Sequence, residues 1–202
     1  LKSLGLEAHV VEFAPRLMPV QLDPDGGAAL KARIEELGVR VHLNRATSEI
    51  VAGEEYAYRM NFSDGESLET DLIVFSAGIR PQDALGHNAG LNVAERGGVV
   101  IDSDYQTIGE CASWKGNVFG LVAPGYTMAR NLASLLMGEP HESFIGADMS
   151  TKLKLLGVDV GSIGDAHAAT PGAKSYRFND EVNSSYRRLV VSPDGSQVIG
   201  AV

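Results

Sequence analysis

The sequence has little cysteine, since Cys111 is the single one among 202 residues. One thiol cannot close an internal disulfide, and it cannot hold an iron–sulfur cluster that needs four thiolates. We therefore expect a reducing location such as the cytosol and no Cys-rich metal site in these residues. No apolar run approaches the roughly 20 residues that cross a bilayer. Residues 1–6 lack a basic segment followed by an apolar core, so no signal peptide is expected.

Positive charge is also scarce: the sequence has 17 Lys and Arg residues but 26 Asp and Glu residues, which gives a net charge of −9. This balance argues against a nucleic-acid partner or an anionic membrane surface. An anionic cofactor would therefore have to be bound by local hydrogen-bond donors, because the overall negative charge of the protein does not attract it. With 44% hydrophobic and 21% charged residues, the composition is that of an ordinary globular protein. The length suits one large domain or parts of two to three smaller ones.

The first residues resemble the second half of a dinucleotide-binding βαβ unit. Residues 1–6 look like the last helical turn, closed by Gly5, and residues 8–13 form an apolar run of strand length that carries Glu12 near its end. In such a unit a glycine-rich turn lies about 20 residues before the acid. That turn would fall before Leu1, so we expect the sequence to begin inside a domain.

A second βα unit follows. Asp23 is a predicted N-cap, with Pro24 at the first helical position. Apolar residues at helical spacing continue to Leu37, Gly38 closes the helix, and residues 39–43 form a buried-type strand. Helix and strand together predict a parallel sheet.

The next segment changes to strand-like alternation between residues 56 and 62. Residues 63–65 are a turn signal, and residues 72–75 are predicted to form the next strand of an antiparallel meander. Further on, we predict a strand at 99–102, leading into residues 105–110, and a helix at 125–137 closed by Gly138. Its inward positions would be Met128, Leu132 and Leu135 or Leu136.

The remainder is predicted to be rich in β-strands. Strand-like runs occupy 153–163, 186–191 and 198–202, and a turn at 192–195 joins the last two. The predicted fold class is α/β, with partial Rossmann-like domains, an antiparallel meander and part of a β-rich interface domain. The predicted divisions are 1–83, 84–143 and 144–202.

Glu12 is the first candidate site residue, because a carboxylate at this strand end can accept hydrogen bonds from both ribose hydroxyls of an adenosine. It would repel a 2′-phosphate and so favours NADH over NADPH. Arg16 favours NADPH instead, since a nearby arginine can accommodate the 2′-phosphate. A solvated acid at a strand end is the plain alternative.

Two glycine-containing segments are the other candidates. Residues 70–81 predict a strand running into Gly78 and then a proline, which lets backbone approach a planar ligand. Residues 108–112 place Gly109 and Glu110 where a carboxylate could meet a sugar or polyol hydroxyl. On physical grounds alone, a strand followed by a tight turn is the preferred interpretation of residues 70–81, and a simple turn is an adequate alternative for residues 108–112.

Taken together, these segments resemble the flavoprotein reductases with two dinucleotide-binding domains. Residues 70–81 look like that family's T-D-x-hydrophobic-x-x-A-x-G-x-x-P motif, which leads from the NADH domain back to the FAD domain. Residues 108–112 resemble its A-x-G-D-x-A motif, with Glu110 in place of the acid that binds the FAD ribityl chain. The resemblance implies cofactor contacts at Glu12, Ala77, Gly78, Gly109, Glu110, Ala112 and Gly125.

Residues 75–82, 119–126 and 147–160 are similar, more particularly, to the large subunits of assimilatory NAD(P)H nitrite reductases. This resemblance implies electron flow from NADH to FAD and on to iron–sulfur and siroheme centres outside these residues. It also implies a small-subunit partner, and residues 144–202 resemble an interface region that mediates dimers. Gly125 would begin a helix whose N-terminus faces the flavin. No protein acid or base is required for hydride transfer, so no catalytic residue is assigned.

One departure concerns residues 107 and 108, between which the family has several more residues. Either the loop is shorter here or residues have been lost from the sequence; we favour loss, because direct joining would remove the strand that presents Glu110. The five histidines show no metal-type spacing, and Cys111 is interpreted as a small buried residue. Two other readings stay open: a standalone NADH:ferredoxin or rubredoxin-type reductase, and a non-catalytic interaction module.

Overall fold

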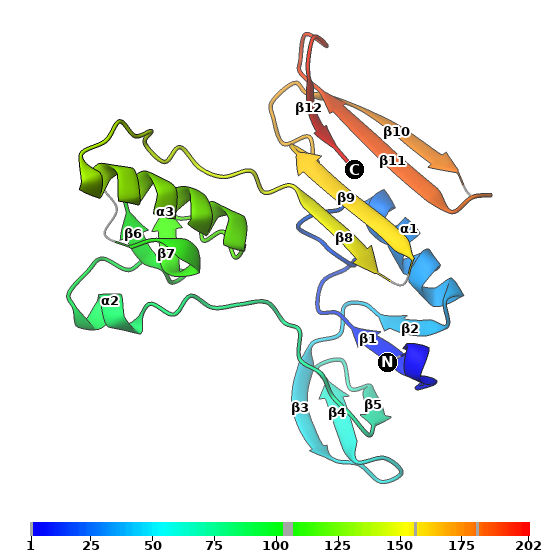
Figure 1. The fold of residues 1–202 in the computed structure, drawn as a ribbon. Coiled ribbons are helices and arrows are strands. Elements are labelled where there is room, and N and C mark those ends of the chain that lie inside the picture. Colours follow the sequence, from blue (N-terminus) through cyan, green and yellow to red (C-terminus); the bar gives the residue numbers. More distant parts are fainter. Residues whose placement is uncertain (1, 103–106, 156, 181) are drawn as a thin grey trace. The chain divides into compact units, whose positions relative to one another are not determined.

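The chain forms two compact units, seen in Figure 1. The computed structural model describes residues 2–102, 107–155, 157–180 and 182–202. Unit 1 consists of Leu1–Val74 together with Ser150–Val202, and unit 2 is Phe75–Met149. Two expectations fall partly outside the described residues: the helical turn at Leu1 and the stretch that begins at residue 105.

Unit 1 begins with the predicted βα unit. After η1 (Lys2–Leu4), strand β1 (Ala8–Val11) pairs in parallel with β2 (Val39–His42), and α1 (Pro24–Glu36) connects them. The Asp23 side chain caps α1 by accepting a hydrogen bond from the Gly26 amide at 3.0 Å. Gly38 ends the helix at a φ of +81°, a value that favours glycine. The sequence prediction for this unit is confirmed.

The predicted meander exists, but one of its strands lies elsewhere. It consists of β3 (Thr47–Ala52), β4 (Tyr58–Phe62) and β5 (Ser67–Thr70), paired antiparallel in that order. Residues 72–75, predicted as a strand, belong to no regular element. Leu72, Val74 and Phe75 are 59%, 67% and 74% exposed, and no described strand pairs with this segment. A strand needs a hydrogen-bonded neighbour as well as apolar residues, and here the neighbour is missing.

The C-terminal residues of unit 1 form a five-stranded antiparallel sheet, as the β-rich prediction requires. The predicted run 153–163 divides into two strands at Gly157, and one strand, β10, was not predicted at all. β10 lies at the edge of the sheet and pairs with β11, and the predicted turn at 192–195 joins β11 to β12. The spatial order is β10 (Lys174–Asp180), β11 (Ser185–Val191), β12 (Val198–Ala201), β9 (Val158–Gly164) and β8 (Thr151–Leu155).

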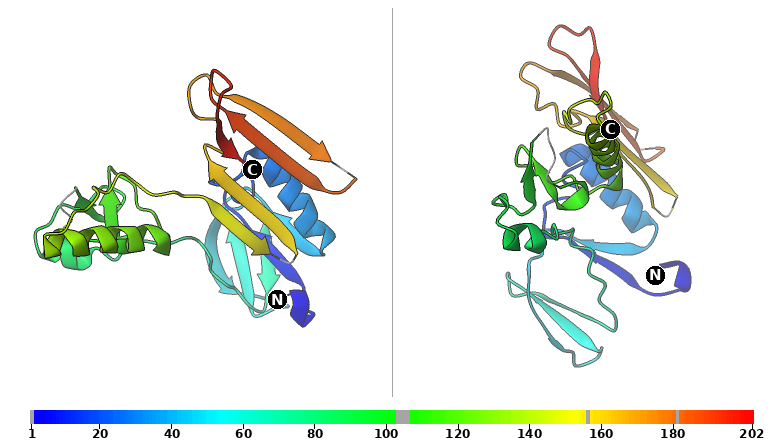
Figure 2. Two further views of the ribbon diagram at one scale, coloured as in Figure 1. Left: turned by 45° about the horizontal axis from the view of Figure 1, so that its top comes forward. Right: turned by 60° about the vertical axis from the view of Figure 1, so that its left-hand side comes forward.

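Helix α1 is the element that joins the two chain segments of unit 1. One side of α1 packs against the five-stranded sheet, and another packs against the parallel pair of β1 and β2 (Figure 2). Leu30 and Ile34 of α1 share one buried cluster with Val39 of β2 and Val160 of β9. Burial of such side chains stabilises the fold by about 1.5–3 kcal/mol each. Unit 1 therefore has one core made from both segments.

Unit 2 contains a second short parallel sheet. Met128 of its long helix is fully buried beside Ile101 and Ala112. Leu132 packs on the same cluster, and Leu136 is 77% exposed, so Leu135 is the inward residue of the predicted pair. The elements are α2 (Ala84–Asn88), β6 (Val99–Ile101), η2 (Gly109–Cys111), β7 (Ala112–Trp114), which pairs in parallel with β6, and α3 (Val122–Met137).

The predicted helix start at Gly125 is wrong by three residues. The helix begins at Val122 after the N-cap Leu121, and Pro124 lies in its first turn, where proline is tolerated. Gly138 ends it in the left-handed conformation, as predicted. In the part of the chain that the structure describes, no helix has the length and apolarity to span a bilayer.

Candidate functional site

Glu12 lies directly after β1, at the carboxyl end of the parallel pair. Its amide donates to the His42 carbonyl at 2.9 Å, which ties it to the end of β2. Its Oε1 accepts a hydrogen bond from the Ala14 amide at 2.8 Å. The side chain is therefore half-buried and held in a local turn. Carboxyl ends of parallel strands are where α/β sheets bind nucleotides, and the role of Glu12 there stays a prediction.

Arg16 is folded back onto its own loop. Its Nε donates to the Leu22 carbonyl at 2.9 Å, and Nη2 donates to the Pro19 carbonyl at 3.2 Å. The side chain packs against Gly27, where an added Cβ would lie 2.9 Å from the Arg16 Cβ. Two of its five N–H donors are used on main-chain carbonyls, which hold the guanidinium against its own loop.

Ala77 and Gly78 lie on an exposed segment of unit 2. Gly78 has a φ of +84°, and a Cβ built there would meet no atom within 4 Å. The following residue, Ile79, packs near the loop before α3, because a Cβ on Gly120 would lie 3.1 Å from Ile79 Cδ1. The backbone at Gly78 is open to a ligand, and the segment after it reaches the start of α3.

Two of the predicted cofactor residues meet in unit 2. A Cβ on Gly125 would lie 3.2 Å from the Gly109 Cα, so α3 and η2 approach closely because both positions lack a side chain. Glu110 follows Gly109 and is exposed, whereas Ala112 is fully buried at the start of β7. A Cβ on Gly109 itself would meet no atom within 4 Å, so its backbone is open beside the Glu110 carboxylate, an arrangement that suits a polyol or a planar ring.

The junction at residues 107 and 108 lies just before η2. Neither residue lies in a strand, and the flavin-type motif covers η2 and the first residue of β7. Glu110 is therefore presented by a short 3-10 turn. Gly125 is the fourth residue of α3, past the positions whose amides are free at a helix start, so its predicted place at the helix N-terminus is wrong.

Two cavities lie away from these residues. One of about 320 Å³ is in unit 1 between α1 and strands β9 and β11. Another of about 610 Å³ is in unit 2, beside Trp114 and Phe119. None of the predicted cofactor residues lines either cavity. Of the candidate residues, Ala77, Gly78 and Glu110 are exposed, Glu12, Gly109 and Gly125 are half-buried, and Ala112 is buried.

The histidines and Cys111 show ordinary contacts. His9 Nδ1 and His42 Nε2 are 3.0 Å apart, and their rings stack at 5.1 Å. Burial, followed by the charges of His9, Arg45 and Arg40, lowers the pKa of His42. Cys111 Sγ donates to the Ile108 carbonyl at 3.4 Å and is half-buried. Among the described residues there is no group of three or more side chains suited to holding a metal ion.

Sequence reasoning missed one buried polar cluster. Asp23 Oδ2 accepts hydrogen bonds from the Tyr186 hydroxyl at 2.7 Å and from Arg188 Nη1 at 2.9 Å. Asp23 was predicted only as a helix cap. Tyr186 and Arg188 are two residues apart in β11 and so lie on one face of the strand. No local sequence pattern predicts that their partner is Asp23, more than 160 residues away.

The parallel β1–β2 pair connected by α1, with a carboxylate directly after β1, has the layout of a nucleotide-binding α/β unit. Residues 1–129 match the family described as pyridine nucleotide-disulphide oxidoreductase. The chain belongs to this family. Residues 150–202 match a second description, the rubredoxin NAD+ reductase C-terminal domain.

Curated relatives extend the similarity over the whole chain. It is 56% identical over 209 residues to the nitrite reductase [NAD(P)H] large subunit of Klebsiella oxytoca, covering 100% of this chain and 22% of that protein. It is 55% identical over 210 residues to the nitrite reductase (NADH) large subunit of Escherichia coli K12, covering 100% and 25%. The chain therefore spans about a quarter of the length of these relatives.

Both alignments are longer than the 202-residue chain, so these relatives have positions without a counterpart in it. A solved structure supports the fold alone. The NAD-dependent persulfide reductase from A. fulgidus matches with a TM-score of 0.77 and 21% identity, covering 99% of this chain and 41% of that one.

Proposed function

We propose that the chain is the electron-entry part of an assimilatory NAD(P)H nitrite reductase large subunit. The observation that carries the proposal is the 55–56% identity over the whole chain to two such large subunits. In the complete protein, electrons would pass from NADH to FAD and then to iron–sulfur and siroheme centres that reduce nitrite to ammonia. Those centres would be held by residues outside this chain.

The chain's own residues would bind and orient the two cofactors. Glu12 would accept the ribose hydroxyls of NADH, and its negative charge would disfavour NADPH. Ala77 and Gly78 would leave room for the nicotinamide. Gly109, Glu110, Ala112 and Gly125 would flank the FAD ribityl chain and ring. FAD, when bound, supplies the two-electron acceptor, so the chain needs to bind, align and exclude water.

Three features support the assignment of these residues. Glu12 lies at the carboxyl end of a parallel pair, and a Cβ on Gly109, next to Glu110, would meet no atom within 4 Å, so the backbone there is open. Gly78 is open, with a positive φ. Within the proposal, residues 1–83 bind NADH, residues 84–143 bind FAD and residues 144–202 begin an interface region. A small subunit and a second copy of the chain are the proposed partners, and the cytosol, which suits a single free thiol, is the proposed location.

The test uses the natural gene product that carries this chain. We expect a yellow protein that oxidises NADH, reduces an artificial dye and forms ammonium from nitrite in the ratio that electron balance requires. In that protein, Glu12→Gln should raise the KM for NADH by about tenfold with little change in kcat, because one charge-assisted hydrogen-bond acceptor is lost. Glu7→Gln is the matched control, since Glu7 is 62% exposed and pairs with Arg40. Dye reduction without any ammonium would contradict the nitrite reductase assignment.

A second candidate is a reductase that passes electrons to a small redox protein. The match of residues 150–202 to the rubredoxin NAD+ reductase C-terminal domain favours it. The same protein would then reduce rubredoxin or ferredoxin with NADH and leave nitrite unchanged. The higher identity over the whole chain makes nitrite reductase the first choice.

A further inference from the structure

The loop of residues 12–22 connects β1 to α1 and has no regular secondary structure. It carries Glu12 at its start and Arg16 in its middle, the two residues whose charges bear on pyridine-nucleotide binding. Met18 has a φ of +48°, and its carbonyl accepts hydrogen bonds from the Gln21 and Leu22 amides. A loop of this kind holds side chains in place only where further contacts fix it.

One fixing contact comes from the C-terminal strand region. His167 Nε2 lies 2.8 Å from the Val20 carbonyl oxygen and donates to it. His167 itself is held in a tight turn, because the Asp165 carboxylate accepts hydrogen bonds from the Ala169 and Thr170 amides at 2.8 Å each. The turn therefore fixes the position of His167, which is 147 residues away from Val20 in the sequence.

A second contact fixes the end of the loop. Arg188, 8% exposed, donates to Asp23, 3% exposed, which follows Leu22 and caps α1. The Arg188 Nη2 also reaches the His167 carbonyl at 3.5 Å. The two contacts are therefore parts of one network that holds the loop at Val20 and at Asp23.

This network bears directly on Arg16. The carbonyls that hold its guanidinium belong to Pro19 and Leu22, on either side of Val20. Fixing Val20 and Asp23 thus fixes the acceptors that keep Arg16 folded back. The two carbonyls take two of the five N–H donors of the guanidinium and hold it against residues 19–22, so reaching a 2′-phosphate with its Nε and Nη2 donors would require breaking these bonds.

We infer that His167 and Arg188 are positioning residues for the pyridine nucleotide: they hold the loop of residues 12–22 so that Glu12 meets the ribose while Arg16 is kept away from a 2′-phosphate. The inference rests on the proposed use of NADH by this chain. It assigns to the C-terminal strands a role in nucleotide affinity and in NADH over NADPH selectivity.

The test measures NADH- and NADPH-dependent dye reduction by the natural gene product with His167→Ala, His167→Gln or the control His87→Ala. His87 lies exposed on α2 and serves as a matched histidine. Loss of one hydrogen bond corresponds to about a fivefold effect. We expect His167→Ala to raise the KM for NADH about fivefold at unchanged kcat and to lower the NADH-to-NADPH ratio of kcat/KM. Glutamine retains an N–H donor at the Nε2 position and should restore most of both values.

Hydrogen exchange of residues 13–22 provides the direct readout of the loop. It should become faster in His167→Ala and stay slow in His167→Gln and His87→Ala. Wild-type KM and selectivity in His167→Ala would overturn the inference while leaving the proposed function intact. A wild-type protein that oxidises neither nucleotide would instead refute the proposed function, and the inference with it.

Discussion

Asp23 combines two tasks that seldom meet in one side chain. Its Oδ1 caps α1 through the Gly26 amide, and its Oδ2 accepts from Tyr186 and Arg188. Burial opposes ionisation, but the hydrogen bonds from Tyr186 and Gly26 and the charge of Arg188 outweigh it, so the pKa of Asp23 lies below its ordinary value. Burial, followed by the hydrogen bond to Asp23, raises the pKa of Tyr186.

Replacing Asp23 should therefore be costly. Asp23→Ala removes the cap and leaves Arg188 buried without its carboxylate, which typically destabilises by about 3–5 kcal/mol. Urea denaturation followed by circular dichroism measures this loss. Asp25→Ala, which breaks the exposed Asp25–Arg177 pair, is the control and should have a far smaller effect. Equal losses in both variants would show that the buried network contributes nothing beyond a surface ion pair.

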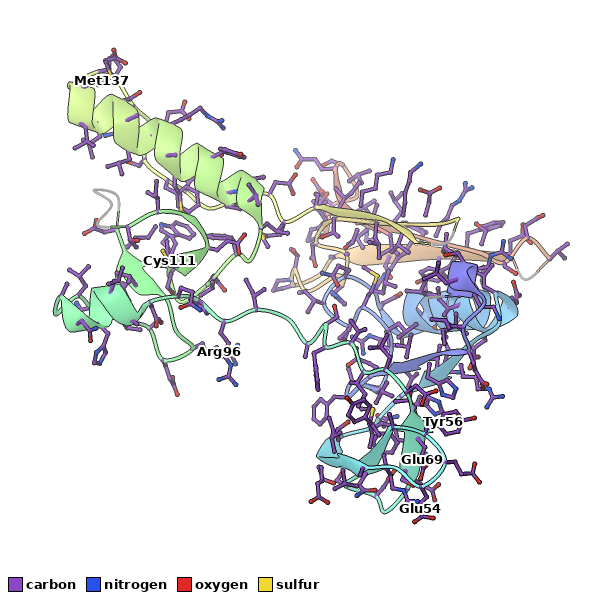
Figure 3. All side chains as sticks on the ribbon, turned by 60° about the horizontal axis from the view of Figure 1, so that its bottom comes forward. Glu54, Tyr56, Glu69, Arg96, Cys111 and Met137 are labelled. Atoms are coloured by element: carbon purple, nitrogen blue, oxygen red, sulfur yellow. The ribbon has the colours of Figure 1, made fainter. Side chains whose placement is uncertain are left out.

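Glu69 shows how one carboxylate can organise a loop (Figure 3). It accepts the amides of Glu55 at 2.8 Å and of Glu54 and Tyr56 at 3.2 Å, and the Arg59 Nε at 2.9 Å. The backbone hydrogen bonds from Glu55 and Glu54 are the main reason that the pKa of Glu69 falls to about 2. The loop between β3 and β4 is therefore held by an ionised side chain of β5.

A depressed pKa makes this stabilisation sensitive to acid. The contribution of Glu69 is present above the ordinary glutamate pKa of about 4.3 and is lost as the pH falls towards about 2. Glu69→Gln should lower the melting temperature at pH 7. It should also make the melting temperature depend less on pH between about pH 4.3 and about pH 2. Glu66→Gln, an exposed neighbour on the same hairpin, should leave the wild-type profile unchanged. The comparison is made by thermal unfolding from pH 7 to pH 2.

At the scale of elements, the approach of α3 to η2 depends on two residues without side chains. An added methyl on Gly125 would lie 3.2 Å from the Gly109 Cα, so η2 would have to move by a few tenths of an ångström. η2 carries Glu110, the proposed FAD ligand. The fit between these elements therefore bears on flavin binding.

A size series at Gly125 tests this fit. Alanine is a better helix former than glycine by about 1 kcal/mol, so Gly125→Ala should not weaken α3 itself. We expect FAD retention to fall in Gly125→Ala and further in Gly125→Val, measured as flavin absorbance per protein after gel filtration. Ser134→Ala, on the same helix and away from η2, should retain wild-type flavin. Full retention in Gly125→Val would show that η2 is not displaced or does not hold FAD.

Elements with local signals were predictable from the sequence. The Asp23–Pro24 start and Gly38 end fixed α1 to within two residues, because caps act within a single turn. Residues 72–75 have an equally apolar pattern and form no strand, since pairing depends on a neighbour that local pattern cannot name. β10 was missed because Tyr176 and Phe178 alternate among polar residues in an exposed strand.

The candidate site was predictable in part. The order of the sequence motifs identified Glu12 and the glycines at 78, 109 and 125 as candidates, and their roles remain predictions. Geometry contributes the Gly109–Gly125 approach and the loop contacts of His167 and Arg16. These contacts join residues far apart in the chain, so composition and periodicity carry no trace of them.

At the scale of the whole molecule, unit 2 is inserted between the two segments of unit 1. Residues 71–83 and 138–150 connect the units without regular secondary structure. They differ in burial, since Phe75 is 74% exposed and Phe144 only 4%. Phe144 packs edge-on against Trp114 and Phe119 at 5.6 Å, which anchors its connection to unit 2.

Limited digestion with a protease that cuts after aromatic residues should distinguish the two connections. Cleavage after Phe75 should precede cleavage after Phe144, because proteases need an exposed, extended backbone. The piece ending at Phe75 should then stay bound to the rest, since residues 1–74 and 150–202 share one core. Mass spectrometry identifies the cuts, and native gel filtration shows the association. Separation of the piece under native conditions would contradict a shared core.

The inserted arrangement also affects how the protein is made. Asp23 and Arg188 are 165 residues apart, and the ribosome adds about 5–20 residues per second. The nascent chain will therefore expose the inner face of α1 for roughly 10–30 s before its covering strands are synthesised. During that interval Leu30 and Ile34 are ready binding sites for a chaperone, so folding yield in the cell should depend on translation speed between the two halves of unit 1.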